Sequence, residues 1–390
     1  MESGVAEQVL QHVRGQREDL IELLGRLVDA ESPSSTPDSH RLVLSVLHKA
    51  FGSLDFEARM PRVANAHRHF YARRRDRRRG TPKQLVVGHY DTVWPIGTLS
   101  KRPFTVDDNV IRGPGVFDMK GGITQMVMAL RAIRDLDLQM PAEPIVFINS
   151  DEEIGSRTST RYIKALAKRV QRAYVLEPSL GDKGAIKTER KGIGRFTVTV
   201  HGKAAHAGLD PEGGASAILE LSHVIQSLFA LNDADKGITV NVGTVDGGLQ
   251  PNVIAPHSQA VVDVRVPTIA DGEQIEQTIH SLEPTTPGVR LTIEGGIGRP
   301  SMEQTPRNKA LWEQAESLGR ELGMELTQVR AGGGSDGNTT SQYTATLDGL
   351  GPVGHGAHAE HEFLYIDKTI ERAALLAMLL LVPPAVGVRP

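Results

Sequence analysis

The segment LVVGHYDTV at residues 85–93 joins a short apolar run directly to His89 and Asp91. A run of this length, bounded by a polar loop, is typical of a strand buried on both faces. The pattern recurs in IVFI at residues 145–148 and YVL at residues 174–176. Helical segments separate these runs, and such alternation predicts an α/β domain with a mostly parallel sheet and helices on both faces.

The helices of this domain are expected from apolar residues that recur with helical spacing. They begin with an N-terminal helical region up to Val28 and continue at residues 41–51, 122–133 and 158–170. The apolar residues from 373 to 382 form the longest such stretch, which is far shorter than the roughly 20 residues that span a bilayer. We therefore interpret it as a C-terminal core helix.

The pattern changes near Gly194, where Phe196, Val198 and Val200 alternate with polar residues, as in a strand with one solvated face. A β-α-β-β-α-β order follows and predicts a ferredoxin-like α+β domain. Its elements are expected at residues 194–200, 215–231, 238–245, 260–266, 273–282 and 289–294. We expect the boundaries to be 1–189 for the first part of a catalytic domain, 190–300 for an inserted domain and 301–390 for the second part.

The composition of the 390 residues limits the classes of partner. Hydrophobic residues make up 39% and charged residues 23%, which is ordinary for a globular chain of two domains. The net charge of -3 provides no basic field for nucleic acid or an anionic membrane, so we expect a small-molecule substrate or a second copy of the chain. The N-terminal residues lack the pattern of a secretory signal, which favours the cytoplasm.

One charge run, RRRDRRR, extends from Arg73 to Arg79 between two strand-like pieces. An anion or RNA patch is one interpretation. A solvated hairpin turn is favoured, because isolated charge runs usually lie on a solvated surface.

Chemistry-bearing side chains follow several of the apolar runs. Each one alone is equally compatible with a helix cap or a surface position. Together they predict a site, because the carboxyl ends of strands in an open α/β sheet are where such sites assemble. The chain has no cysteine, so a zinc site must use imidazole and carboxylate, as catalytic zinc sites do. The candidate ligands are His89, Asp118, Glu153, Glu177 and His358.

Charge supports a site for two zinc ions. Two such ions bring four positive charges, and three carboxylates with one hydroxide balance them, which a buried site requires. Asp151, Glu152 and Glu153 are consecutive, so one glutamate can bind metal while its neighbour faces the substrate. Asp91, two residues after His89, is placed to orient its ring.

Two other classes of function stay open on the residues alone. The segment GGGSDG contains a G-x-S-x-G pattern around Ser335, which would fit a serine hydrolase, although little chain follows it for the partners that such a fold needs. A non-catalytic metabolite-binding protein with this fold is the other alternative. Binding alone would not require the five candidate ligands together with a further acid such as Glu152, which argues against it.

The motifs HYDTV, GPGVFDMKGG, NSDEEIGS, EPS and the His358 to Glu362 pair resemble those of a family of co-catalytic zinc aminoacylases and exopeptidases. That family includes glutamate carboxypeptidase, acetylornithine deacetylase and succinyl-diaminopimelate desuccinylase, and the resemblance covers nearly the whole chain. It implies that Asp118 bridges two zinc ions and that Glu152 is the general base, with Asp91 orienting His89. The implied ligand sets are His89, Asp118 and Glu177 for one ion, and Asp118, Glu153 and His358 for the other.

The resemblance also assigns roles in the inserted domain. His206 in GKAAHAG would reach the active site of a partner subunit, which implies a homodimer formed through residues 190–300. Asn252, Arg265 and Arg299 match substrate-contact positions, and the two arginines could hold a carboxylate bidentately. Lys183 is a weaker match, because the loop after Glu177 is one residue shorter than in glutamate carboxypeptidases.

The expected function is zinc-dependent hydrolysis of an amide bond beside a free carboxylate. A glutamate-carboxypeptidase-like exopeptidase that releases a C-terminal amino acid is favoured. An N-acyl-amino-acid deacylase or a dipeptidase of the same family is the alternative. Cobalt or manganese can occupy sites of this kind in place of zinc.

Overall fold

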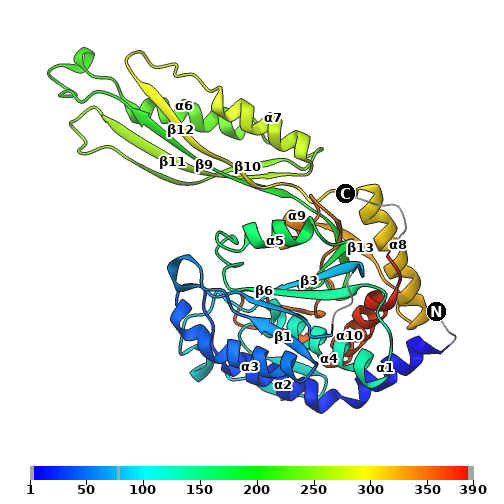
Figure 1. The fold of residues 1–390 in the computed structure, drawn as a ribbon. Helices are drawn as coiled ribbons and strands as arrows, with labels where there is room; N and C mark the ends of the chain where they lie inside the picture. Colours follow the sequence, from blue (N-terminus) through cyan, green and yellow to red (C-terminus); the bar gives the residue numbers. More distant parts are fainter. Residues whose placement is uncertain (1–3, 77–79, 385–390) are drawn as a thin grey trace. The chain divides into compact units, whose positions relative to one another are not determined.

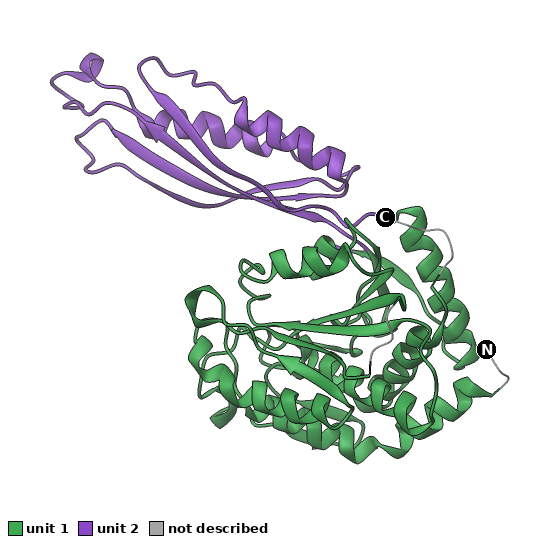
Figure 2. Ribbon diagram, in the orientation of Figure 1, with its two compact units in different colours: residues 1–188, 304–330, 335–390 green, residues 189–303, 331–334 purple. Residues whose placement is uncertain are grey.

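The computed structural model describes residues 4–76 and 80–384. The chain divides into two units (Figure 2). Unit 1 comprises residues 1–188, 304–330 and 335–390, and unit 2 comprises residues 189–303 and 331–334. Unit 1 is therefore discontinuous in sequence, since the chain leaves it after Thr188 and returns at Gln304.

The main sheet of unit 1 has six strands in the order β1-β2-β6-β3-β7-β14. The neighbours from β6 to β14 run parallel, whereas β1 and β2 run antiparallel to their neighbours. The strands are β1 (Phe56–Arg59), β2 (Phe70–Arg74), β3 (Lys83–His89), β6 (Glu143–Asn149), β7 (Arg172–Val175) and β14 (Ala345–Leu347).

Helices cover both faces of this sheet (Figure 1). Val86 of β3 packs into the larger core cluster, and its neighbours Leu85 and Val87 pack into a separate cluster on the opposite face. Successive side chains of a strand point to opposite faces, so an unbroken apolar run is what a doubly covered strand needs. The predicted α/β class is confirmed. The larger cluster holds α1 (Val5–Gly15), α2 (Arg17–Asp29), α3 (Arg41–Gly52), α4 (Gly121–Asp135), α8 (Pro306–Glu321) and α10 (Ile366–Leu381). On the opposite face, α5 (Thr160–Ala167) packs into the cluster of Leu85 and Val87, and α9 (Asp336–Thr340) packs against α5, β7 and β14.

The helix α10 is buried on nearly all sides and packs against α4 and α1. This burial explains its continuous run of alanine, leucine and methionine, because a helix that is apolar all round belongs in a core. The expected C-terminal core helix is thus confirmed. Within residues 4–76 and 80–384, the helices all fall short of the length and apolarity that crossing a membrane needs.

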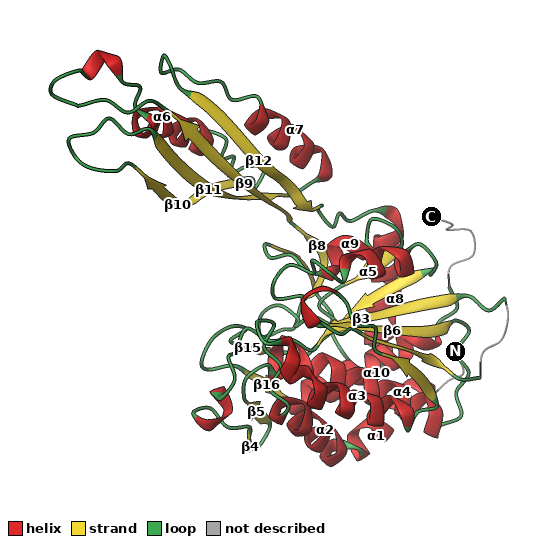
Figure 3. Cartoon of the chain, turned by 60° about the vertical axis from the view of Figure 1, so that its left-hand side comes forward, coloured by secondary structure: helices red, strands yellow, loops and turns green. Residues whose placement is uncertain are grey.

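A small four-stranded sheet in unit 1, ordered β15-β16-β5-β4, joins segments far apart in the sequence (Figure 3). Leu364 of β16 lies opposite Ile111 of β5. This pairing brings the loop before β16 next to the loop after β5. Both loops carry candidate metal ligands. The strands are β4 (Thr105–Asp107), β5 (Val110–Arg112), β15 (Gly354–His355) and β16 (Phe363–Tyr365).

Unit 2 contains an antiparallel sheet in the order β10-β11-β9-β12 with two helices. This is the ferredoxin-like order that the sequence predicts. Phe196 and Val198 of β9 pack under the helices, and the intervening Arg195 and Thr197 lie outside that core. The elements are β9 (Gly192–His201), α6 (Ala217–Phe229), β10 (Thr239–Gly247), β11 (His257–Val266), α7 (Ile269–His280) and β12 (Arg290–Arg299). A further pair of strands, β8 (Ile186–Arg190) and β13 (Gln328–Ala331), forms a two-stranded sheet.

The expected hairpin at the arginine run is wrong. β2 ends at Arg74 and β3 begins at Lys83, but β6 lies between these two strands in the sheet. The strands β2 and β3 are therefore not the two neighbouring strands of a hairpin. Residues 77–79 of the run lie outside the described residues.

Phe147 on β6 provides a test of the doubly covered sheet. Its side chain is 1% exposed and stacks on Tyr162 at 6.1 Å between ring centroids. We expect Phe147→Ala to lower the free energy of unfolding by about 3–5 kcal/mol, because it leaves a cavity in the core. Urea unfolding followed by tryptophan fluorescence reports on unit 1, since Trp94 and Trp312 both belong to it.

The matched control is Leu42→Ala on α3, where the leucine is 67% exposed and should matter by less than about 0.5 kcal/mol. Equal losses in the two variants would contradict the assignment of Phe147 to a buried layer.

Candidate metal centre

The candidate ligands converge at one edge of the main sheet. His89 is the last residue of β3, and Glu153 and Glu177 follow β6 and β7, which are the neighbours of β3. The three strands are parallel, so their carboxyl ends lie side by side. Asp118 comes from the loop before α4, and His358 comes from the loop between β15 and β16.

The two oxygens of Asp118 face two different histidines. Oδ1 lies 3.2 Å from Nε2 of His89, and Oδ2 lies 3.5 Å from Nε2 of His358. Glu177 Oε1 is 3.5 Å from the same nitrogen of His89, and Glu153 Oε2 is 2.9 Å from that of His358. Among these five side chains, Asp118 therefore contacts both histidines, while Glu177 faces His89 and Glu153 faces His358.

The donor set fits metal ions. Ligand atoms of His89, Asp118 and Glu153 lie within 4.8 Å of one another, and so do those of His89, Glu152 and Glu177. Glu153 also has a buried oxygen, Oε1, without a hydrogen-bond partner among the described residues. A buried acceptor without a donor is costly, and a cation would satisfy it. Imidazole nitrogens and carboxylate oxygens are the donors that divalent transition metals take.

Burial and hydrogen bonding shift the pKa values of several candidate ligands. Burial raises the pKa of Glu153 to about 7, because the loss of hydration outweighs the attraction of His358. The hydrogen bond to Glu153 raises the pKa of His358 to about 9. Burial alone would lower the pKa of His89, but its hydrogen bonds with Asp118, Asp91 and Glu177 hold that pKa well above the ordinary value.

Asp91 contacts both the ring of His89 and the backbone of the loop after β6. Nδ1 of His89 lies 3.0 Å from the backbone oxygen of Asp91 and 3.5 Å from its carboxylate, so the closer contact is with the backbone. A donor bond from Nδ1 leaves Nε2 free to face Asp118. The carboxylate of Asp91 accepts bonds from the Ser34 hydroxyl at 2.7 Å and from the backbone N–H groups of Glu152 and Glu153 at 3.2 Å.

Sequence reasoning missed several residues that shape the site. Ser34 lies far from Asp91 in the chain, and nothing in its local sequence marks it. Asp336 accepts bonds from the Ser156 hydroxyl at 2.6 Å and from the Asn149 amide, and so fixes the two ends of the loop that carries Glu152. Asp336 lies in the segment GGGSDG, directly after the Ser335 of the G-x-S-x-G pattern.

The candidate substrate residues of the inserted domain lie in unit 2. The loop of His206 bridges to Val253, and the backbone N–H of Ala207 donates to Asn252 at 3.0 Å. Arg265 on β11 and Arg299 on β12 are both register partners of Ile193 on β9, so they lie on either side of it in the sheet. The guanidinium of Arg265 already pairs with Asp263 at 2.8 and 3.0 Å. Lys183 belongs to unit 1 and lies in an exposed turn.

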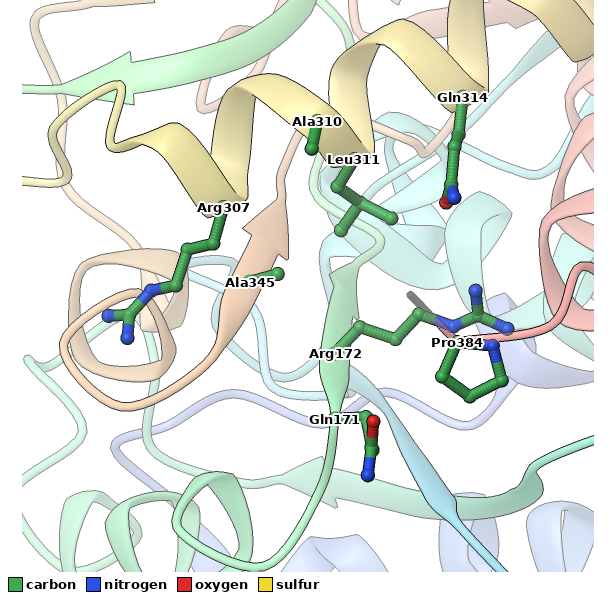
Figure 4. Close-up of a pocket in the computed structure, with 8 residues that line it drawn as sticks. All are labelled: Gln171, Arg172, Arg307, Ala310, Leu311, Gln314, Ala345 and Pro384. Carbon is green, nitrogen blue, oxygen red and sulfur yellow. The ribbon is translucent and has the colours of Figure 1, made fainter. Parts of the chain in front are cut away.

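Figure 4 shows the residues that line a pocket of about 40 Å³ in unit 1. It includes Gln171 and Arg172 at the start of β7, Ala345 at the start of β14, and Arg307 and Leu311 of α8. In a parallel sheet the starts and ends of the strands lie at opposite edges, so this pocket is at the edge opposite the metal ligands. None of the candidate site residues lines it.

The sequence of residues 85–382 matches the family model described as Peptidase family M20/M25/M40. The chain belongs to this family and is a metallopeptidase.

Relatives and solved structures agree with the family. The chain is 28% identical over 312 residues to carboxypeptidase G2 of Pseudomonas sp. (strain RS-16), covering 78% of this chain and 74% of the relative. Its fold is similar to that of the aminopeptidase PepT from Bacillus cereus ATCC 10987, with a TM-score of 0.76 at 20% identity over 93% of this chain and 98% of that one. It is also similar to the YXEP protein of Bacillus subtilis, a dinuclear metal-binding peptidase from the M20 family, with a TM-score of 0.69 at 13% identity over 95% and 99% of the chains.

Family membership decides between the alternative classes. The serine hydrolase is wrong, and the structure gives the physical reason. Ser335 is buried as the N-cap of α9, where its hydroxyl donates to Asp348 and accepts from the backbone N–H of Gly337. That hydroxyl helps to hold a helix end. A non-catalytic binding protein is likewise disfavoured in a family of peptidases.

Metal content distinguishes the adjacent glutamates. We expect Glu153→Gln to reduce bound metal from about two ions to about one per subunit, because it replaces an anionic donor that faces His358. Glu152→Gln is the matched variant and should keep both ions. Metal analysis after gel filtration measures the two contents. Loss of metal in Glu152→Gln with retention in Glu153→Gln would mean that the two roles are exchanged. This outcome is physically possible, because Glu152 also lies close to His89 and Glu177.

Proposed function

We propose that this metallopeptidase uses two zinc ions to cleave an amide bond beside a free carboxylate and so releases a C-terminal amino acid. The observation that carries the proposal is the division of the site about Asp118, whose two oxygens face His89 and His358. A dinuclear ligand set with Glu152 beside it is the equipment that amide hydrolysis needs.

Each group in unit 1 has a chemical task under this proposal. Two zinc ions, when bound by the two ligand groups, would supply Lewis acidity and lower the pKa of water. Glu152 takes a proton from the attacking water and returns it to the leaving nitrogen, a transfer worth roughly two to four orders of magnitude in rate. The carboxylate of Asp91 accepts a hydrogen bond from the backbone N–H of Glu152 and so helps to position the backbone from which the base extends.

Recognition of the free carboxylate is assigned to Arg265 and Arg299. Guanidinium groups bind carboxylates through two parallel hydrogen bonds. A substrate carboxylate at Arg265 has to compete with Asp263, which already occupies that fork. The relative carboxypeptidase G2 is named as a carboxypeptidase, and this name supports recognition of the C-terminal end of a substrate. A deacylase of N-acyl amino acids or a dipeptidase is the second candidate, because an arginine that binds an α-carboxylate would serve any of these substrates.

A substrate panel tests the carboxylate requirement. N-acyl glutamates, folate-like glutamates, other acyl amino acids and dipeptides are scored for released amine in the zinc-loaded enzyme. We expect Arg299→Gln to raise KM roughly 10- to 100-fold for the best substrate, because a hydrogen bond to a charged group is lost. A chelator should abolish turnover and zinc should restore it.

The control is the same substrate with its carboxylate amidated, which should be a poor substrate for wild type and insensitive to Arg299→Gln. Equal turnover of the acid and the amide would contradict carboxylate recognition. Full activity in the presence of the chelator would contradict the metal mechanism itself.

We also propose a homodimer formed through unit 2, in which His206 of one subunit binds the substrate carbonyl oxygen at the metal centre of its partner. The strand β10 is an edge of its sheet, and Val245 on it is 60% exposed. On the adjacent α6, Ile218, Leu219 and Phe229 are also exposed. An uncovered strand edge with apolar side chains is a typical pairing surface. Leu209, three residues after His206, is 83% exposed.

Mixing two inactive variants tests the role of His206 in the partner. His206→Ala and Glu152→Ala subunits are mixed under conditions that allow exchange. Random pairing makes half of the dimers hybrid with one intact site each, so activity should return to about a quarter of the wild-type value. Absence of recovery, with exchange confirmed by differently tagged subunits, would contradict a role in trans.

A further inference from the structure

The side chain of Glu362 collects four N–H donors. Its Oε1 accepts bonds from the backbone of Phe117 at 2.9 Å and of Asp118 at 3.0 Å. Its Oε2 accepts from the backbone of Gly115 at 2.8 Å and from the indole nitrogen of Trp94 at 3.0 Å. The residue is only 3% exposed. Each carboxylate oxygen thus has two donors and little access to solvent.

Three of these donors belong to the loop that ends at the bridging ligand. Binding Gly115, Phe117 and Asp118 at once fixes the backbone from which the Asp118 side chain extends. Gly115 has φ 76°, and a Cβ there would lie 2.7 Å from a Thr92 methyl carbon. The loop therefore approaches its neighbours too closely for a side chain, and the carboxylate of Glu362 is what holds it there.

The other contacts of Glu362 reach the remaining parts of the centre. Glu362 lies four residues after His358 in the loop between β15 and β16, and its backbone oxygen accepts from Gly113 at 3.4 Å. Trp94 lies three residues after Asp91, and the guanidinium of Arg102 stacks on its ring at 3.7 Å. One side chain thereby connects the loops that carry His89, Asp118 and His358.

The chemistry of the side chain matters because all four partners are donors. An ionised carboxylate is acceptor-only and offers about four lone-pair sites, whereas a glutamine offers one acceptor oxygen and directs N–H groups from its other end. A glutamine of nearly the same side-chain volume would therefore direct its N–H groups at two of the four donors and could not accept hydrogen bonds from them. Hydrogen bonds to an ionised acceptor are also roughly twice as strong as neutral ones.

We propose that Glu362 is a positioning residue of the metal centre, whose carboxylate holds the backbone of Asp118 so that both oxygens of that ligand stay directed at the two metal positions. The proposal rests on the dinuclear centre proposed above. It concerns the affinity for metal, so its test does not depend on identifying the substrate.

The experiment compares Glu362→Gln with Glu360→Gln in the full chain. Glu360 lies on the same loop, is exposed, and loses the same charge in its variant. Affinity for Zn²⁺ and Co²⁺ is measured by competition with a chromophoric chelator, and the visible absorption of bound Co²⁺ reports ligand geometry. We expect Glu362→Gln to bind metal about 10- to 100-fold more weakly with an altered Co²⁺ spectrum, which is the usual effect of losing a residue that orients a ligand. Glu360→Gln should match wild type.

Several outcomes would overturn the proposal. Wild-type affinity and spectrum in Glu362→Gln would do so, even if the metal-free variant melts at a lower temperature, because that pattern means a role in stability alone. An equal loss of affinity in Glu360→Gln would assign the effect to charge in general. If Glu362→Gln does not fold, Glu362→Asp replaces it. The shorter carboxylate cannot reach all four donors, so an unchanged affinity in that variant would also be decisive.

Wild-type measurements separate the two proposals. A wild-type protein that binds no metal overturns the dinuclear centre together with the role of Glu362. A wild-type protein that binds two ions but cleaves none of the panel overturns the proposed substrate class and leaves the role of Glu362 to be decided by the affinities.

Discussion

The burial of the Asp91 carboxylate is a constraint that connects several parts of the candidate metal centre. A carboxylate removed from water costs several kcal/mol unless donors surround it. Here the donors come from different parts of the chain, namely the Ser34 hydroxyl and the backbone N–H groups of Glu152 and Glu153. The cost of burying one charge is therefore offset only when these segments are in place together. These hydrogen bonds link separate segments in a chain that has no cysteine and so cannot use disulfides for this purpose.

Local patterns predicted the parts of the fold that are locally determined. The runs at β3, β6 and β7 are apolar because both of their faces are covered, and the alternation in β9 reflects its single covered face. The order of strands in a sheet is not local, and for that reason the hairpin expected after Arg74 is wrong: β6, which comes much later in the chain, lies between β2 and β3. Strands of two or three residues, such as β15 and β16, carry too little periodicity to be found at all.

The candidate site divides in the same way. The candidate ligands could be proposed from the sequence because their residue types are those that bind metal and several of them follow a strand. The residues that contact them were harder to find. Ser34 is an ordinary serine that donates to Asp91 only because the fold brings the two together. Glu362 belongs to a motif with His358, but the motif does not reveal the N–H donors that the fold gives to its carboxylate. Asp336 is the instructive case, since the pattern in GGGSDG draws attention to Ser335, whereas the structure shows that the neighbouring Asp336 contacts the loop of Glu152. Even Asp91 differs in detail, as its backbone oxygen is nearer to His89 than its carboxylate is.

The discontinuity of unit 1 has a consequence for the newly made protein. His89, Asp118, Glu153 and Glu177 precede the whole of unit 2 in the chain, whereas His358 and Glu362 follow it. A nascent chain is synthesised from its N-terminus, so it can complete the ferredoxin-like unit while the group that contains His358 still lacks its histidine and the loop of Asp118 lacks its anchor. The candidate metal centre therefore cannot contain all five of its candidate ligands until translation has passed unit 2.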